Sequence, residues 1–193
     1  ERCGIEAETR MLTATGGINT HRGAIFMLGL LCASAGALGQ RPTAALIHQT
    51  LLQRWGEALA ARAQRPSALP GGRAAERFNL RSASTEAAMG FPTLFETAVP
   101  ALQKARGRPV QTARLDTLFA VMAVLDDSNL AHRCGLEGLR FAQSAAQDFL
   151  AAGGASQGVE AAEAIAAEFV RRNLSPGGAA DTLAAACWLD RLS

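Results

Sequence analysis

Polar residues and glycines are dense at the start of an apolar stretch near the N-terminus. Residues 15–26 read TGGINTHRGAIF, so an amide, a hydroxyl, an imidazole and a guanidinium lie beside two glycines. An Asn at a helix start accepts hydrogen bonds from free backbone N–H groups, and an Arg donates two parallel hydrogen bonds to a phosphate. These residue types indicate an anion-binding site, with the candidates Gly17, Asn19, Thr20, His21 and Arg22. The alternative for His21 is a histidine whose hydrogen bonds are satisfied in the core.

A second block of this kind lies near the other end, where residues 173–181 read NLSPGGAAD. Ser175 followed by Pro176 is typical of an N-cap and the first residue of a helix. The N–H groups of Gly177 and Gly178 would then have no partner within the helix, and such a helix end binds phosphate readily. Asp181, one turn later, would oppose a bare phosphate but could hold a divalent cation beside it. The alternative is an ordinary capped helix.

Two adjacent carboxylates and an amide open a third block, residues 126–133, which reads DDSNLAHR. If one helix continues to about His132, its rotation of about 100° per residue puts Asp126, Asn129 and Arg133 on one face. That face also carries the apolar residues Leu115, Phe119 and Met122, whereas Asp127 points elsewhere. Buried polar groups need partners. These residues could pair with each other, as an internal Asp–Arg salt bridge, or bind a ligand or a metal ion. A metal ion is an option because paired carboxylates suit hydrated Mg²⁺.

A fourth block, residues 81–92, places Glu86 ahead of a Gly-Phe-Pro break. Glu86 is a candidate catalytic carboxylate, and the alternative is a solvated carboxylate in a loop. No motif supports a Ser or Cys nucleophile, and the zinc signatures are absent.

The composition favours an all-α protein. Alanine is abundant and Tyr is absent, which favours helices over sheets. The net charge of +2 gives no sign of nucleic-acid binding. Four cysteines without CxxC spacing indicate cytosolic thiols and a cytoplasmic protein. The apolar run 24–38 is too short for a membrane span and is predicted to be a buried core helix, with Cys32 as a small core residue.

Helical periodicity predicts roughly seven to nine helices in one domain spanning residues 1–193. Residues 64–81 contain two prolines and a Gly-Gly pair, so they are predicted to be the only long loop and the best candidate for a mobile lid. Gly153 and Gly154 are expected to end a helix, and Pro176 to open the last one. A face of the helix after Pro42 is predicted from Ile47, Leu51, Trp55 and Leu59.

Taken together, the four blocks resemble the triphosphoribosyl-dephospho-CoA synthases, and the resemblance covers nearly the whole chain. Residues 16–26 fit the pattern GG-[VI]-NTH-[KR]-G-x-IF, and residues 126–135 fit DD-[ST]-N followed by Arg and Gly. Residues 173–181 fit N-[LI]-SPGG-x-AD. The malonate decarboxylase branch is favoured over the citrate lyase branch by Leu130, His132, Arg133, Gly135, Leu136 and Glu137.

The resemblance implies an enzyme that makes 2′-(5″-triphosphoribosyl)-3′-dephospho-CoA from ATP and 3′-dephospho-CoA, with release of adenine. Its product is the precursor of an acyl carrier protein prosthetic group, passed on by a downstream transferase. Mg²⁺ is expected on Asp126, Asp127 or Asp181, and the catalytic candidates are His21, Glu86 and Asp126. The remaining substrate-binding candidates are Arg81, Asn129, Arg133, Asn173, Ser175, Gly177 and Gly178.

The chain also departs from the family pattern. Ser82, Ser84 and Thr85 replace Gly, Arg and Gly of an RGARGEA-like segment, and Cys134 stands where Gly is usual. Family chains carry a further N-terminal region, so the sequence is expected to be the C-terminal part of a longer chain. A homodimer is compatible with this interpretation. Two other functions stay open: a Mg²⁺-dependent helical glycohydrolase of ADP-ribose-type substrates, and a non-catalytic helical ligand-binding domain.

Overall fold

The structure, a computed structural model, describes residues 2–39 and 41–192. In this part of the chain it contains ten α-helices, one π-helical segment, one 3₁₀ segment and no strand, which confirms the all-α prediction. The first half contains α1 (Arg2–Ala14), α2 (Arg22–Gly36), α3 (Ala44–Ala63), α4 (Pro70–Phe78) and α5 (Ala83–Ala88). The second contains η1 (Thr93–Ala98), α6 (Val99–Lys104), α7 (Val110–Val124), α8 (Ser128–Ala151), η2 (Gly154–Gln157), α9 (Glu160–Arg171) and α10 (Gly177–Asp190).

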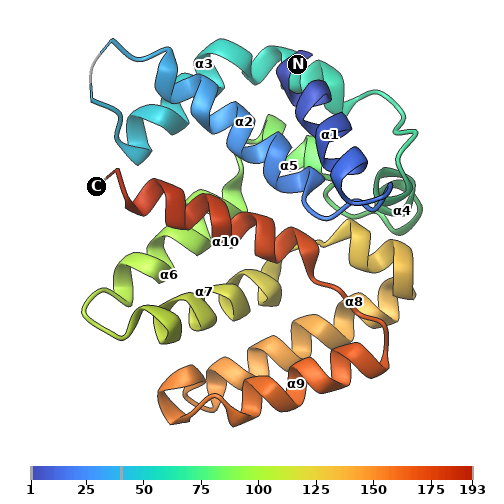
Figure 1. The fold of residues 1–193 in the computed structure, drawn as a ribbon, viewed down its shortest axis with the longest axis vertical. Helices are drawn as coiled ribbons and strands as arrows, with labels where there is room; N and C mark the ends of the chain where they lie inside the picture. The colour runs from blue at the N-terminus through green and yellow to red at the C-terminus, as the bar shows by residue number, and fades with distance from the viewer. Residues whose placement is uncertain (1, 40, 193) are drawn as a thin grey trace.

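Helix α10 packs against α2 on one side and against α6, α7 and η1 on the other, so it joins the two halves of the molecule (Figure 1). Its small residues Ala179, Ala185 and Ala186 are fully buried, which lets the neighbouring helices approach closely. The core around α10 includes Leu31 and Leu189, both without exposed surface. The last helix in the chain is therefore central to the packing.

Several predicted elements are confirmed. Thr43 caps α3 by accepting a hydrogen bond from the N–H of Leu46, 3.3 Å away. The predicted apolar face of α3 packs into the core through Ile47, Leu51 and Leu59, with Trp55 partly buried beside them. Gly153 ends α8 with φ of 104°. Local spacing was sufficient for these elements because each has its own start or stop signal.

The prediction that one helix runs through residues 115–132 is wrong. Helix α7 ends at Val124, Leu125 is extended with ψ of 130°, and α8 begins at Ser128. The break occurs because the Asp127 side chain accepts hydrogen bonds from the first turn of α8, as an N-cap does. A second bend follows at Gly135, whose φ of 71° is left-handed.

The prediction of a long loop over residues 64–81 is also wrong. Residues 70–78 form α4, with Pro70 in its first turn. Gly71, Ala74 and Ala75 are buried, and α4 packs closely against α8. Proline and glycine here act as helix-start residues and close-packing residues, so this segment is not a free lid.

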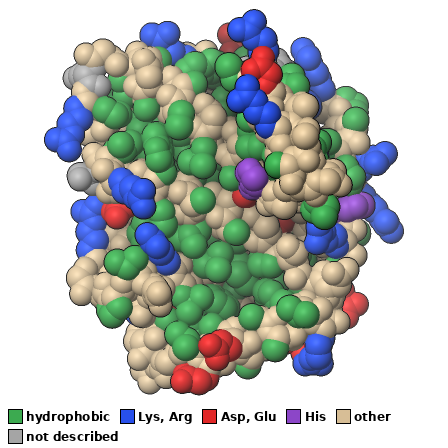
Figure 2. Space-filling view, in the orientation of Figure 1, with side chains coloured by type: hydrophobic (Ala, Val, Ile, Leu, Met, Phe, Trp, Pro, Cys, Tyr) green, Lys and Arg blue, Asp and Glu red, His purple; other side chains and the backbone are tan. Residues whose placement is uncertain are grey.

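Helix α2 is less buried than predicted, because only Leu31 and Ser34 are fully buried along it and Cys32 is exposed. Partly buried apolar side chains of α2 contribute to a face on which hydrophobic side chains gather at the centre and most Lys and Arg side chains lie at the edge (Figure 2). In the described residues, none of the helices combines the length and the apolar character that crossing a bilayer requires.

Candidate active site

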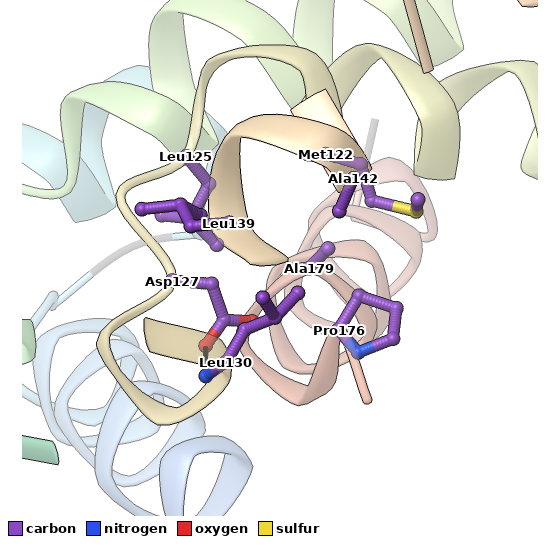
Figure 3. A pocket seen from close by; sticks show the side chains of 8 residues that line it. All are labelled: Met122, Leu125, Asp127, Leu130, Leu139, Ala142, Pro176 and Ala179. Carbon is purple, nitrogen blue, oxygen red and sulfur yellow. Dashed lines mark hydrogen bonds between the residues drawn. The ribbon is translucent and has the colours of Figure 1, made fainter. Parts of the chain in front are cut away.

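The Asp127 carboxylate connects the starts of two helices that are far apart in sequence. Its Oδ1 accepts hydrogen bonds from the N–H groups of Asn129 and Leu130, each at 3.1 Å, at the start of α8. Its Oδ2 accepts one from the N–H of Gly178, 2.8 Å away, in the first turn of α10. Figure 3 shows the carboxylate beside the Leu130 backbone nitrogen, to which a dashed line joins it. We call residues 125–129 the aspartate turn.

Asp181 makes a similar link between α10 and α2. Its carboxylate lies directly against Gly23 in the first turn of α2, where a Cβ would collide with it. The backbone N–H of Ala24 is also close enough to favour the charged form of this carboxylate. A larger residue at position 23 would therefore have to displace the Asp181 carboxylate. The starts of α2, α8 and α10 thus meet around Asp127 and Asp181.

The electrostatics of the two carboxylates are coupled. Burial raises the pKa of Asp181 from 3.8 to about 6, and the charge of Asp127 raises it too, whereas the Ala24 N–H and His21 lower it. Burial also raises the pKa of Asp127, which is only 5% exposed, while the N–H groups that it accepts from act in the opposite direction. Helix starts carry positive partial charge, which favours anionic groups at this place.

The fourth block joins the aspartate turn through Arg81. The Arg81 N–H donates to Asp126 Oδ2, 3.2 Å away, and its guanidinium pairs with Glu86 Oε1 at 3.1 Å. Glu86 is buried at 6% exposure and accepts hydrogen bonds from the N–H and hydroxyl of Thr93. The alternative of a solvated Glu86 is therefore wrong. Its oxygens are used inside the protein, which suits a residue that positions Arg81.

The start of α4 lies on another side of the aspartate turn. A Cβ at Gly71 would lie 2.8 Å from Asn129 Oδ1 and 3.2 Å from Ser128 Oγ. Sequence reasoning missed this neighbour and missed Thr93. A signal for α4 was present, because Pro70-Gly71-Gly72 repeats the Pro-Gly-Gly sequence of residues 176–178. Thr93 left no such signal.

The first block forms the predicted helix start. The N-cap position of α2 is His21, not Asn19 or Thr20, but the Asn19 side chain accepts a hydrogen bond from the Arg22 N–H at 3.0 Å. His21 is exposed, and its Nδ1 lies 2.7 Å from the Thr20 hydroxyl, so a buried core histidine is excluded. The Arg22 guanidinium pairs with Glu8 of α1. Within residues 2–39 and 41–192, its Nε is the one buried side-chain polar atom without a hydrogen-bond partner.

Comparison with known proteins identifies the family of this chain. The profile of the CitG family, described as ATP:dephospho-CoA triphosphoribosyl transferase, matches residues 1–193. The chain belongs to this family. It is 43% identical over 197 residues to an Azotobacter vinelandii protein named "Probable 2-(5''-triphosphoribosyl)-3'-dephosphocoenzyme-A synthase", covering 99% of the chain and 66% of the relative. It is 40% identical over 202 residues to the Klebsiella pneumoniae 2-(5''-triphosphoribosyl)-3'-dephosphocoenzyme-A synthase, covering 100% and 69%.

A Pseudomonas syringae relative with the same "Probable" name is 40% identical over 197 residues, covering 99% of the chain and 66% of the relative. The chain thus spans about two thirds of the length of these curated relatives. No solved structure matches it. The CitG family assignment rests on the sequence alone, and the geometry above describes how a member of that family arranges its polar blocks.

Several predicted contacts in this CitG-family chain are corrected. Ser175 does not cap α10: Pro176 holds the N-cap position, the Ser175 carbonyl accepts from the Gly177 N–H, and Asp127 accepts from Gly178. The two glycine N–H groups predicted to be free are therefore engaged. Asn129 and Arg133 are exposed and Asp127 is buried, the reverse of the prediction, because the break before α8 shifts the helical phase.

The predicted Mg²⁺ ligands do not form a metal site as they stand. In the described residues, no group of three or more His, Cys, Asp or Glu side chains is placed to hold a metal ion. Asp127 uses both oxygens on backbone N–H groups, and Asp126 uses one on Arg81. Asp181 is packed against the backbone of Gly23. As arranged here, these carboxylates do not fit a Mg²⁺ site.

Asn173, a predicted substrate-binding residue, lies just before α10. It is exposed and has a left-handed φ of 56°. Its carbonyl accepts a hydrogen bond from the Cys134 thiol, with 3.3 Å between Sγ and the oxygen, so this segment is joined to the bend of α8. The Asn173 side chain is exposed beside the α10 start.

The space beneath Asp127 is too small for a substrate. It measures about 10 Å³, enough for a water molecule at most, and its walls are mainly apolar (Figure 3). The lining residues are Met122, Leu125, Asp127, Leu130, Leu139, Ala142, Pro176 and Ala179. His21, Asn129 and Arg133 are exposed to solvent outside this space.

Proposed function

We propose that this chain carries the catalytic residues for transfer of the triphosphoribosyl group of ATP to the 2′-hydroxyl of 3′-dephospho-CoA, with release of adenine. The N-glycosidic bond of ATP breaks, a bond forms between C1″ and the 2′ oxygen, and the triphosphate stays intact. One proton leaves the 2′-hydroxyl and one is gained by adenine, so the reaction is balanced without a redox partner.

The observation that carries the proposal is the meeting of all four polar blocks around the aspartate turn. Gly178 and Arg81 donate backbone hydrogen bonds to Asp127 and Asp126, and Asp181 lies against Gly23. Residues from four distant parts of the chain thus surround one place, in a protein whose family description names this transfer. A shared site is the simplest reason for polar residues to gather there.

Asp126 is the best placed carboxylate for the reacting sugar. It is half-buried, one oxygen accepts from Arg81, and in the described residues no protein hydrogen bond reaches the other oxygen. As adenine leaves, C1″ gains positive charge, and a carboxylate held beside it stabilises that charge. We assign this electrostatic role to Asp126.

His21 is the proposed group for proton transfer. Its Nδ1 faces the Thr20 hydroxyl, which leaves Nε2 for a substrate, and the ring is exposed at the start of α2. A histidine exchanges protons near neutral pH, as needed to protonate adenine or to accept the 2′-hydroxyl proton. Glu86 stays in the proposal as the residue that orients Arg81.

The triphosphate is assigned to the exposed and half-buried donors around the turn, namely Asn19, Thr20, Arg22, Asn129, Arg133, Asn173 and the backbone near Gly17. Arg residues recognise phosphate through two parallel hydrogen bonds. Binding there would displace Arg22 from Glu8, its partner in the free protein.

The cellular setting is proposed from sequence resemblance. Leu130, His132 and Arg133 favour the malonate decarboxylase branch, in which a downstream transferase would pass the product to an acyl carrier protein in the cytoplasm. A homodimer is compatible with this role. Complementation of a strain that lacks its own synthase would distinguish the branches: growth on malonate supports the proposal, and rescue of citrate lyase alone contradicts it.

The test is adenine release by the full-length protein given ATP, with and without 3′-dephospho-CoA. The proposal predicts adenine release only with the acceptor, together with a product that retains all three phosphates by mass spectrometry. Adenine release without the acceptor would indicate a glycohydrolase. Absence of adenine under both conditions, from a folded full-length protein, would contradict an enzymatic role.

A further inference from the structure

Asp127 differs from the other carboxylates near the turn in the number and origin of its partners. Three backbone N–H groups donate to it, two from α8 and one from α10. The donors on α8 and α10 are separated by about fifty residues in the chain. One buried side chain therefore closes two helix starts at once.

The residue type is demanded by this geometry. A carboxylate accepts on both oxygens, whereas an amide of the same shape accepts on one and donates on the other. In an Asn at this position, the NH₂ group would face either the Gly178 N–H or the two N–H groups of α8. Because Asp127 is only 5% exposed, bulk solvent does not readily replace the lost acceptor.

We propose that Asp127 is a positioning residue: it fixes the starts of α8 and α10 relative to each other. It thereby sets where Asp126 meets the reacting sugar and where Asn129 and Asn173, beside these two helix starts, meet the triphosphate. This inference rests on the proposed function for its catalytic consequence. It replaces the metal-ligand role predicted for Asp127 from sequence, because both oxygens are already used by backbone donors.

The neighbours of Asp127 make the consequence specific. Asp126 precedes it directly and is tied to Arg81. Gly178 is close to Asp127 on its other side, since a Cβ there would lie 3.0 Å from Oδ2. If α10 separates from the aspartate turn, the Asp181 contact with Gly23 of α2 is disturbed as well. Loss of the hydrogen bond between Gly178 and Asp127 should therefore misplace the starts of α10 and α2.

The test is Asp127→Asn in the full-length protein. With the amide oxygen kept on the two donors of α8, the Gly178 N–H loses its acceptor, so its hydrogen exchange should accelerate by about tenfold or more. We expect the KM for ATP to rise by about tenfold, with the Mg²⁺ concentration for half-maximal activity unchanged. An unchanged KM, or a shifted Mg²⁺ requirement with Gly178 still protected, would overturn the proposal.

Asp116→Asn is the matched control. Asp116 of α7 also links a distant backbone, because its Oδ1 accepts from the Ala155 N–H at 2.7 Å and its Oδ2 pairs with Arg108 at 2.7 Å. This variant should lose stability and keep the wild-type KM for ATP. An equal rise of KM in both variants would show that Asp127 acts only through general stability, which contradicts a positioning role.

A second readout separates this inference from the proposed function. If wild-type protein releases no adenine, the proposed function fails. Binding of inorganic tripolyphosphate, measured by calorimetry, then tests the positioning role of Asp127 by itself. Weaker binding in Asp127→Asn than in Asp116→Asn supports the positioning role. Equal binding of tripolyphosphate by both variants and the wild type contradicts it.

Discussion

The starts of α4 and α10 have the same Pro-Gly-Gly sequence but differ in what closes them. At α10, the buried Asp127 accepts the Gly178 N–H. At α4, Gly71 lies against the neutral side chains of Ser128 and Asn129, and no side chain among the described residues caps the helix. Both starts contact the aspartate turn, but with different side chains. The Asp127 carboxylate neutralises the positive end of α10, whereas the positive end of α4 meets neutral side chains. A helix-start motif alone does not indicate an open anion site.

The largest expected effect comes from Asp126, in the aspartate turn that both helix starts contact. Asp126→Ala removes the carboxylate assigned to the reacting sugar, and we expect adenine release to fall by at least about 100-fold. The helical fold should persist, because Asp126 is half-buried and its carboxylate is tied to the rest of the described chain only through the Arg81 N–H. Circular dichroism and the adenine assay check the two expectations. Wild-type turnover would remove Asp126 from the site.

The next effect tests the asymmetry of the two starts through stability. Asp127→Ala leaves three backbone N–H groups without their acceptor, and we expect the free energy of unfolding to fall by about 3 kcal/mol. Asn129→Ala, on the α4 side, should change it by less than about 1 kcal/mol because the side chain is exposed.

Urea denaturation of both variants measures this difference. Equal losses would mean that the α4 start depends on Asn129 as strongly as the α10 start depends on Asp127, and the comparison would fail. A small loss in both variants would instead show that water satisfies the freed N–H groups of α8 and α10.

A smaller effect separates the two glycines of the α10 start. A Cβ at Gly178 would lie 3.0 Å from Asp127 Oδ2 and 3.1 Å from Leu125 Cδ2, so Gly178→Ala should cost about 1 kcal/mol of stability. A Cβ at Gly177 meets nothing within 4 Å, and Gly177→Ala should stabilise the protein by about 0.5 kcal/mol through helix propensity. Thermal unfolding gives both values, and equal effects would exclude close packing on Asp127.

The helical class and most helix ends were predictable because their signals are local. Thr43 before α3 and Gly153 after α8 act on neighbouring residues, and Asn19 accepts from the N–H of Arg22, three residues later. The residue types of the four polar blocks also predicted that they form one site. The structure shows contacts between these blocks, and their shared function stays a prediction.

The partners of the carboxylates were not predictable from local signals. The expectation that Asp127 points away from the core assumed that α7 continues through position 127. Because Asp127 is instead the N-cap of a new helix, α8, the helical phase of every later residue changes. Its bond to Gly178 spans 51 positions, and the contact of Asp181 with Gly23 is longer still in sequence. Proline and glycine at residues 70–72 were assigned to a loop because the α8 surface that orders them is also remote.

The smallest expected effect concerns Asp181, which is half-buried at the junction of α10 and α2. Burial raises its pKa in the folded protein from 3.8 to about 6. Between these two values the folded state binds more protons at this residue than the unfolded state does. The contribution of Asp181 to stability is therefore fully present below pH 3.8 and is lost as the pH rises through about 6.

Asp181→Asn carries no titrating proton at this position, so it should lose this part of the pH dependence. The unfolding free energy of the wild type relative to the variant should fall between about pH 4 and about pH 7, and urea denaturation of both proteins across this range measures the difference. The effect is modest because solvent reaches part of the carboxyl group and screens it. Parallel curves would mean that Asp181 titrates alike in the folded and unfolded states, and the carboxylate would then not be held in the desolvated contact with Gly23 that joins α10 to α2.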